Sequence, residues 1–129
     1  MKNIDVDCQI EFIKASSYIG NTTMTIGNVQ ISNVMNFPIE NRDILIVEDI
    51  LDSGLSLKHI TEVLKCRGAN SLKICAFLDK PENRKADIEA DYVGVKVPNE
   101  FVVGYGLDYA EKYRNLPYVG VLKPEVYTK

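Results

Sequence analysis

The pattern of apolar and polar positions is clearest between residues 44 and 57. Four apolar residues at 44–47, three of them β-branched, predict a strand that is buried on both faces in a parallel sheet. Two acids, Glu48 and Asp49, end this predicted strand, and a short turn rich in Ser and Gly follows at 52–56. From Leu57 onward the apolar residues recur with the period of a helix. The pattern therefore predicts a strand, a tight turn and a helix in immediate succession.

The helix after the turn is expected to end close to residue 68. Lys65 and Arg67 fall in its last turn, where basic side chains suit the negative end of the helix dipole, and Gly68 is a suitable stop. The only histidine, His59, lies on the polar side of the helix and is predicted to be a solvated surface residue. The apolar face of the helix is formed by four residues, Leu57, Ile60, Val63 and Leu64.

Shorter apolar runs predict further strands on both sides of this unit. Additional strands are expected at 8–15, 24–26, 28–31, 72–78, 91–97 and 118–122. The small and polar residues at 16–23 predict a mobile loop, and the charged segment 82–90 predicts a short helix or an irregular crossover. Strands separated by helical segments indicate an α/β fold with a mainly parallel sheet, in one domain over residues 1–129.

Composition and charge narrow the class of protein. The chain has 46% hydrophobic and 26% charged residues, which is sufficient for one small domain with its own core. Its net charge of -3 gives no indication of a nucleic-acid or membrane surface, and there is no apolar run long enough to span a membrane. Three scattered cysteines, Cys8, Cys66 and Cys75, are typical of reduced thiols in a cytoplasmic protein.

The polar residues around the central turn indicate a phosphate site. A Gly/Ser turn at the start of a helix offers free backbone N–H groups to an anion. The neighbouring acids suit Mg²⁺ or sugar hydroxyls, so the implied ligand is a metal-bound sugar phosphate. Ligands of parallel sheets bind outside the carboxyl ends of the strands, where Glu48, Asp49, Asp79 and Lys80 are all expected.

Two other interpretations account for part of this stretch. A strand ending in two acids also occurs near the start of response-regulator receiver domains. A receiver would begin with this strand, however, whereas here it starts at residue 44, and the turn at 52–56 does not fit. A plain capped turn would explain Asp52 and Gly54 singly. It would not explain three acids and two hydroxyls within nine residues.

The sequence resembles the type I phosphoribosyltransferases. The run VEDILDSGLSL at 47–57 is similar to their phosphoribosyl-pyrophosphate motif. The run FVVGYGLDY at 101–109, followed by YRNL at 113–116, resembles the hypoxanthine/guanine branch, and the ending at 121–127 resembles its bacterial members. The likeness extends from about residue 8 to the end of the chain.

This resemblance implies an enzyme of purine salvage. Such enzymes transfer the phosphoribosyl group from phosphoribosyl pyrophosphate to hypoxanthine or guanine with Mg²⁺, giving IMP or GMP and pyrophosphate. By resemblance, Asp52 is the general base, and the sugar and its 5′-phosphate are held by Glu48, Asp49, Asp52, Ser53, Gly54, Leu55 and Ser56. The purine site would comprise Lys80, Phe101, Val102 and Asp108, and the metal ligands would be Glu48, Asp49 and Asp108. Pyrophosphate and a closing loop would involve Arg114, Ser16, Ser17 and Tyr18.

One part of the family pattern has no counterpart in this sequence. The family has a strand, a Leu-Lys-Gly turn that binds pyrophosphate, and a helix ahead of the region that matches residue 8. No Lys-Gly of that kind occurs here, so one core strand is expected to be missing and the pyrophosphate site to be weakened. A non-catalytic remnant that binds IMP or GMP is therefore an alternative to an active enzyme. Relatives form dimers or tetramers, which implies a homo-oligomer.

Overall fold

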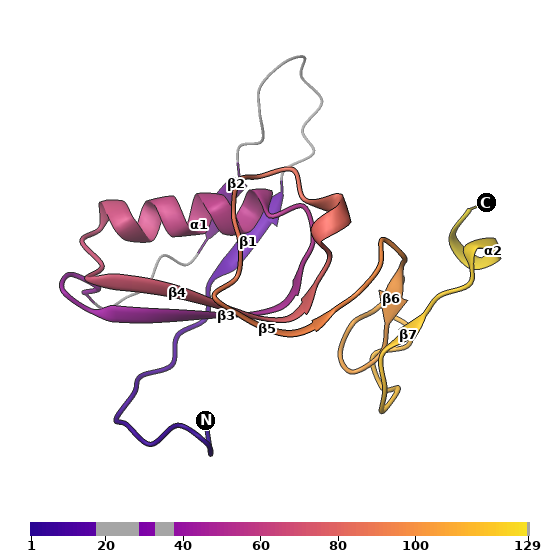
Figure 1. Ribbon diagram of the computed structural model, residues 1–129, viewed down its shortest axis with the longest axis horizontal. Helices are drawn as coiled ribbons and strands as arrows, with labels where there is room; N and C mark the ends of the chain where they lie inside the picture. The colour runs from indigo at the N-terminus through magenta and orange to yellow at the C-terminus, as the bar shows by residue number, and fades with distance from the viewer. Residues whose placement is uncertain (18–28, 33–37, 129) are drawn as a thin grey trace, which may run out of the picture. The chain divides into compact units, whose positions relative to one another are not determined.

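The computed structural model describes residues 1–17, 29–32 and 38–128 (Figure 1). The chain divides into two compact units. The first unit comprises Met1–Ile44 and Leu55–Leu72, and the second comprises Leu45–Gly54 and Lys73–Lys129. The expectation of one domain over the whole chain stays a prediction. None of the helices in the described part is long and apolar enough to cross a membrane.

The first unit contains a short hairpin and the main helix. Strand β1 (Lys14–Ser17) pairs antiparallel with β2 (Val29–Ser32), and both strands contact helix α1 (Leu55–Cys66). The buried positions of α1 recur every three or four residues, as the sequence predicts, and they are Leu57, Ile60, Thr61 and Leu64.

The end of α1 follows the sequence prediction closely. Gly68 has a φ of 87°, in the left-handed region that glycine adopts without strain. Its N–H donates to the carbonyl of Lys65 at 3.0 Å, and the N–H of Ala69 donates to that of Leu64 at 3.3 Å. These two bonds form a Schellman motif, which satisfies carbonyl groups that the helix end leaves unpaired.

The second unit is organised by a three-stranded sheet with the order β3-β4-β5. Its strands are β3 (Asp43–Leu51), β4 (Ser71–Asp79) and β5 (Tyr92–Lys96), the first two of which begin in the first unit. Strands β4 and β5 pair in parallel, with Cys75 opposite Tyr92 and Leu78 opposite Val95. The strands expected at 72–78 and 91–97 and the α/β class are therefore confirmed.

The second unit also contains smaller elements. The segment 82–90 begins with a single 3-10 turn, η1 (Pro81–Asn83), and continues without regular structure. Strand β6 (Val102–Val103) pairs antiparallel with β7 (Gly120–Val121), and the short helix α2 (Pro124–Tyr127) lies near the end of the chain.

Two predictions about β3 are wrong. The strand is not buried on both faces: its positions alternate between exposed and half-buried, and Leu45 and Val47 are 48% and 74% exposed. The apolar run suggested two covered faces, but β3 lies at the edge of the sheet in the described part of the chain. Glu48 and Asp49 also do not end the strand, because Ile50 and Leu51 extend it beyond the acids and Leu51 is almost completely buried.

The N-terminal predictions also need correction. The strand expected at 8–15 begins only at Lys14, and residues 8–13 have no regular structure. Ser16 and Ser17, expected in a mobile loop, belong to β1 and pair with Gln30 and Val29. Backbone pairing with β2 overrides the preference of small polar residues for loops. Tyr18 and the strand expected at 24–26 lie outside the described residues.

Candidate active site at the strand ends

The second unit brings the ends of β3 and β4 together. Asp52 follows β3, Lys80 follows β4, and the N–H of Lys80 donates to the carbonyl of Leu51 at 2.9 Å. Asp79 and Lys80 are only 7% and 8% exposed, which is unusual for charged residues unless they are paired. Buried charge is therefore concentrated at the carboxyl ends of these strands, where ligands of parallel sheets bind.

The Asp52 carboxylate has two polar neighbours. Asn83 donates from Nδ2 to Oδ1 of Asp52 at 2.6 Å, and Nζ of Lys80 lies 3.7 Å from Oδ2. The sequence analysis expected Lys80 at a strand end and Asp52 in the turn after the preceding strand, and the structure brings their charged groups together. The sequence analysis gave no role to Asn83, which lies in a charged segment that was interpreted as a short helix or an irregular crossover.

Arg84 joins the two strand ends. Its guanidinium forms an ion pair with Asp79 and donates to the backbone carbonyls of Leu51, at 2.9 Å, and Asp52. The same segment continues the contact, because the N–H groups of Lys85 and Ala86 both donate to the carbonyl of Ser53, at 2.9 and 3.1 Å. The turn after β3 is therefore held in place by the segment after β4. Sequence reasoning missed Arg84, since nothing in its neighbourhood distinguishes it from other surface cations.

There is a steric reason for a glycine at position 54 in the turn. Gly54 has a φ of 77° and is buried, and a Cβ atom there would lie 2.6 Å from Cγ2 of Ile88 and 3.2 Å from Cδ of Arg84. Neither the backbone conformation nor the available space admits a larger residue. Leu55 and Ser56, also predicted to hold the phosphate, are the first two residues of α1 in the first unit.

Glu48 and Asp49 are in different environments. Consecutive side chains of a strand point to opposite faces, so the structure does not present both carboxylates on one face of β3. Asp49 is exposed and accepts the N–H of Ile50 at 2.8 Å. Glu48 is half-buried, and desolvation, with a smaller contribution from the charge of Asp49, raises its pKa above the ordinary value of 4.5.

The raised pKa of Glu48 predicts that Glu48→Gln stabilises the fold at neutral pH. The folded state holds the proton more strongly than the unfolded state, so stability falls as the pH rises from about 4.5 through the raised pKa. Removing the charge should increase the free energy of unfolding at pH 7 by about 0.5–2 kcal/mol. We expect urea titrations to show this gain at pH 7 and a smaller one at pH 4. Glu100→Gln, the same change at an exposed position, should have little effect at either pH.

An aromatic cluster surrounds Phe101. Its ring lies 5.5 Å from that of Tyr109 in an edge-to-face arrangement and 5.4 Å from that of Tyr127 on α2, with an angle of 32° between the two planes. The carbonyl of Phe101 accepts the N–H of Leu122 at 2.7 Å, and Val102 is buried opposite Val121. Phe101, which is predicted to stack on the purine, therefore contacts two tyrosines to which sequence reasoning gave no role. Their spacing from Phe101 along the chain has no helical or strand period that would reveal these contacts.

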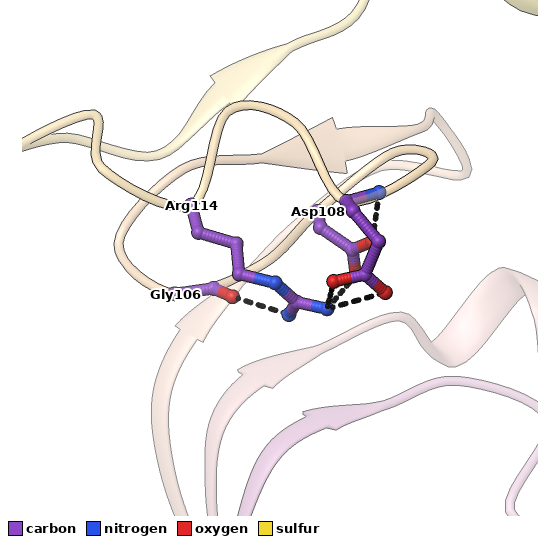
Figure 2. A network of polar contacts seen from close by, with 4 residues as sticks. Gly106, Asp108 and Arg114 are labelled. Atoms are coloured by element: carbon purple, nitrogen blue, oxygen red, sulfur yellow. Dashed lines mark hydrogen bonds and ion pairs between the residues drawn. The ribbon is translucent and has the colours of Figure 1, made fainter.

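Arg114 and Asp108 meet in the loop between β6 and β7 (Figure 2). Nη2 of Arg114 lies 3.2 Å from Oδ1 of Asp108 and 3.1 Å from the exposed carboxylate of Glu111. Nη1 donates to the carbonyl of Gly106 at 3.0 Å, and the other oxygen of Asp108 accepts the N–H of Glu111 at 2.9 Å. The loop is tightly wound: four of its non-glycine residues have positive φ, namely Tyr105, Ala110, Glu111 and Tyr113. Arg114 is thus held in place by carboxylates and a backbone carbonyl.

The carboxylates suit a magnesium ion only in combination with a substrate. Glu48, Asp49 and Asp108 offer the hard oxygen ligands that Mg²⁺ prefers. Within residues 1–17, 29–32 and 38–128, no three acidic, His or Cys side chains gather closely enough to hold a metal. Protein sites for Mg²⁺ commonly supply one or two carboxylates and leave the other positions to water and substrate phosphates. The donor set fits a metal that arrives with a phosphorylated ligand.

Comparison with known families identifies the class of protein. The phosphoribosyl transferase domain family matches residues 3–110, which include both strand ends and the loop with Asp108. The chain therefore belongs to the phosphoribosyltransferase family. The resemblance seen in the sequence is confirmed.

The most informative relatives are bacterial hypoxanthine-guanine phosphoribosyltransferases. The chain is 60% identical over 128 residues to that of Staphylococcus aureus, covering 99% of this chain and 71% of the relative. A crystal structure of a hypoxanthine phosphoribosyltransferase from Staphylococcus aureus superposes with a TM-score of 0.90 over 99% of this chain and 69% of that one. The corresponding structure of a hypoxanthine-guanine phosphoribosyltransferase from Bacillus anthracis is 44% identical, with a TM-score of 0.84 over 95% and 71% of the two chains.

Proposed function

We propose that this protein transfers a phosphoribosyl group from phosphoribosyl pyrophosphate to hypoxanthine or guanine, giving IMP or GMP and pyrophosphate. The observation that carries this assignment is the pairing of Asp52 with Lys80, whose charged groups lie 3.7 Å apart. In an oxopurine, N7 and O6 lie side by side on one edge of the base. A carboxylate and an ammonium group next to each other can accept the proton of N7 and donate to O6. The 60% identity to hypoxanthine-guanine phosphoribosyltransferases supports the same assignment.

The chemistry follows from these placements. Asp52 takes the proton from N7 as N9 forms its bond to C1′ of the ribose and the bond from C1′ to pyrophosphate breaks. The turn at 52–56 orients the 5′-phosphate, and Phe101 stacks on the base. Arg114 would contact pyrophosphate, and the assignment of Ser16, Ser17 and Tyr18 to pyrophosphate and a closing loop stays a prediction. Asp108, Asp49 or Glu48 would hold Mg²⁺ together with the substrate, and the metal would supply charge neutralisation for the leaving group.

The assignment is tested by direct synthesis. The protein should form IMP when it is incubated with hypoxanthine, phosphoribosyl pyrophosphate and Mg²⁺, and omission of any one should abolish the product. Thermal stabilisation by GMP without any turnover would instead indicate the non-catalytic remnant, which the close relatives do not favour. Sedimentation at several concentrations would test the proposed homo-oligomer, and a cytoplasmic location stays a prediction.

Lys80→Gln should weaken selection for oxopurines. Lys80 donates to O6, whereas adenine offers an amino group there and would face the ammonium. We expect kcat/KM for hypoxanthine to fall by about 10–100-fold, the effect of losing a charged hydrogen bond, while discrimination against adenine decreases. The control is Lys85→Gln, the same change at an exposed position five residues further along. Unaltered discrimination in the Lys80 variant would contradict the assignment.

A further inference from the structure

The turn after Lys80 places an amide directly against the catalytic carboxylate. In η1 the N–H of Asn83 donates to the carbonyl of Lys80 and the N–H of Arg84 to that of Pro81, both at 3.2 Å. Pro81 fixes its own φ at the start of this turn. Two backbone bonds and a proline therefore determine where the Asn83 side chain begins. Arg84 binds the carbonyls of Leu51 and Asp52 and so holds this turn close to Asp52, which the Asn83 side chain reaches.

The two oxygens of Asp52 are distinguished by this arrangement. Oδ1 accepts a short hydrogen bond of 2.6 Å from Asn83, whereas Oδ2 lies on the side of Lys80, 3.7 Å from Nζ. The terminal torsion of an aspartate is soft, so a carboxylate without a fixed partner samples many orientations. The hydrogen bond from Asn83 to Oδ1 restricts this rotation of the carboxylate. The oxygen next to Lys80 is then the one directed to accept a proton.

We propose that Asn83 is a positioning residue, which orients the Asp52 carboxylate so that Oδ2 meets N7 while Lys80 meets O6. This inference rests on the proposed function and assigns a role to a residue outside the motifs that indicated it. A neutral donor orients the carboxylate without adding to the positive charges of Lys80 and Arg84, whereas an acid would repel Asp52. Asn83 is half-buried, so water competes only partly for the same oxygen.

The first test compares substitutions of Asn83 in the intact chain. Asn83→Ala should lower kcat for IMP formation by about tenfold, within the range that misplacement of a catalytic group produces. The KM for phosphoribosyl pyrophosphate should stay within about twofold of the parent, because the phosphate turn keeps its bonds to Arg84, Lys85 and Ala86. Asn83→Asp should lower kcat further, since it keeps the shape but sets two carboxylates against each other. Glu82→Ala, an exposed neighbour in the same turn, is the matched control.

A second test separates positioning from general damage to the fold. If Asn83 acts through Asp52, then Asn83→Ala should not change the residual rate when Asp52 is already Ala. A loss of kcat that persists in the Asp52→Ala background overturns the inference, and so does an Asn83→Ala variant as fast as the parent. Thermal unfolding of each variant identifies any that fail to fold, and Asn83→Leu repeats the test with the volume retained. A parent chain that forms no IMP overturns the proposed function together with this inference.

Discussion

Asp52→Asn is expected to lower kcat for IMP formation by about 10²–10⁴-fold, the usual effect of removing a general base. The substitution preserves shape, and the amide oxygen can still accept the hydrogen bond from Asn83, so the turn should stay in place. What is lost is the capacity to take the proton of N7. Steady-state rates with hypoxanthine measure the effect directly. The parent and the variant should bind GMP with similar affinity in a calorimetric titration.

The control for this variant is an aspartate that directly precedes β5. Asp91 is exposed, pairs with Lys73 at 2.7 Å and accepts the N–H of Ile74, so Asp91→Asn changes a structural carboxylate. It should alter stability slightly and leave kcat unchanged. An Asp52→Asn enzyme that turns over at the parent rate would remove Asp52 from its assigned role.

Arg84→Met is expected to destabilise the fold strongly. It leaves Asp79, which is 7% exposed, without its cationic partner and removes donors from the carbonyls of Leu51 and Asp52. Breaking a buried ion pair from one side typically costs about 3–5 kcal/mol. That is a large part of the roughly 5–15 kcal/mol that usually separates folded from unfolded domains. Urea unfolding with linear extrapolation measures the difference.

Two further variants isolate the cause of this loss. Lys85→Met, a change at the exposed cation next in the chain, should shift stability by less than about 0.5 kcal/mol. Asp79→Asn combined with Arg84→Met removes the uncompensated charge and should recover part of the stability. If Arg84→Met alone unfolds at the same urea concentration as the parent, Asp79 does not depend on Arg84.

The sequence predicted elements that are determined locally. The period of α1, its stop at Gly68 and the strands β4 and β5 follow from spacing and from residue chemistry within a few positions. The length of β3 and the start of β1 were wrong, because pairing partners distant in the sequence decide them. A short apolar run indicates that a strand exists but not which of its faces is covered.

The candidate site shows the same division. Lys80 could be placed at a strand end and Asp52 in the turn after the preceding strand, since ligands of a parallel sheet bind outside the carboxyl ends of its strands. Asn83, Arg84 and Tyr127 could not, because their contacts depend on the path of a segment without repeating pattern. Long-range polar contacts of this kind leave no periodic signal in a single sequence. Family resemblance supplied roles for the motif residues but none for the residues that hold them.

The bonds between the two strand ends have a thermodynamic consequence. Lys80 and Arg84 both bind the carbonyl of Leu51, so the segment proposed to contact the base and the turn proposed to contact the sugar phosphate are tied through one peptide group. If one ligand changes the affinity for the other by some factor, the second ligand must change the affinity for the first by the same factor. A displacement of one segment therefore strains the other. Cooperative capture of base and sugar, with an equal factor in either order of addition, is the behaviour that this shared anchor predicts.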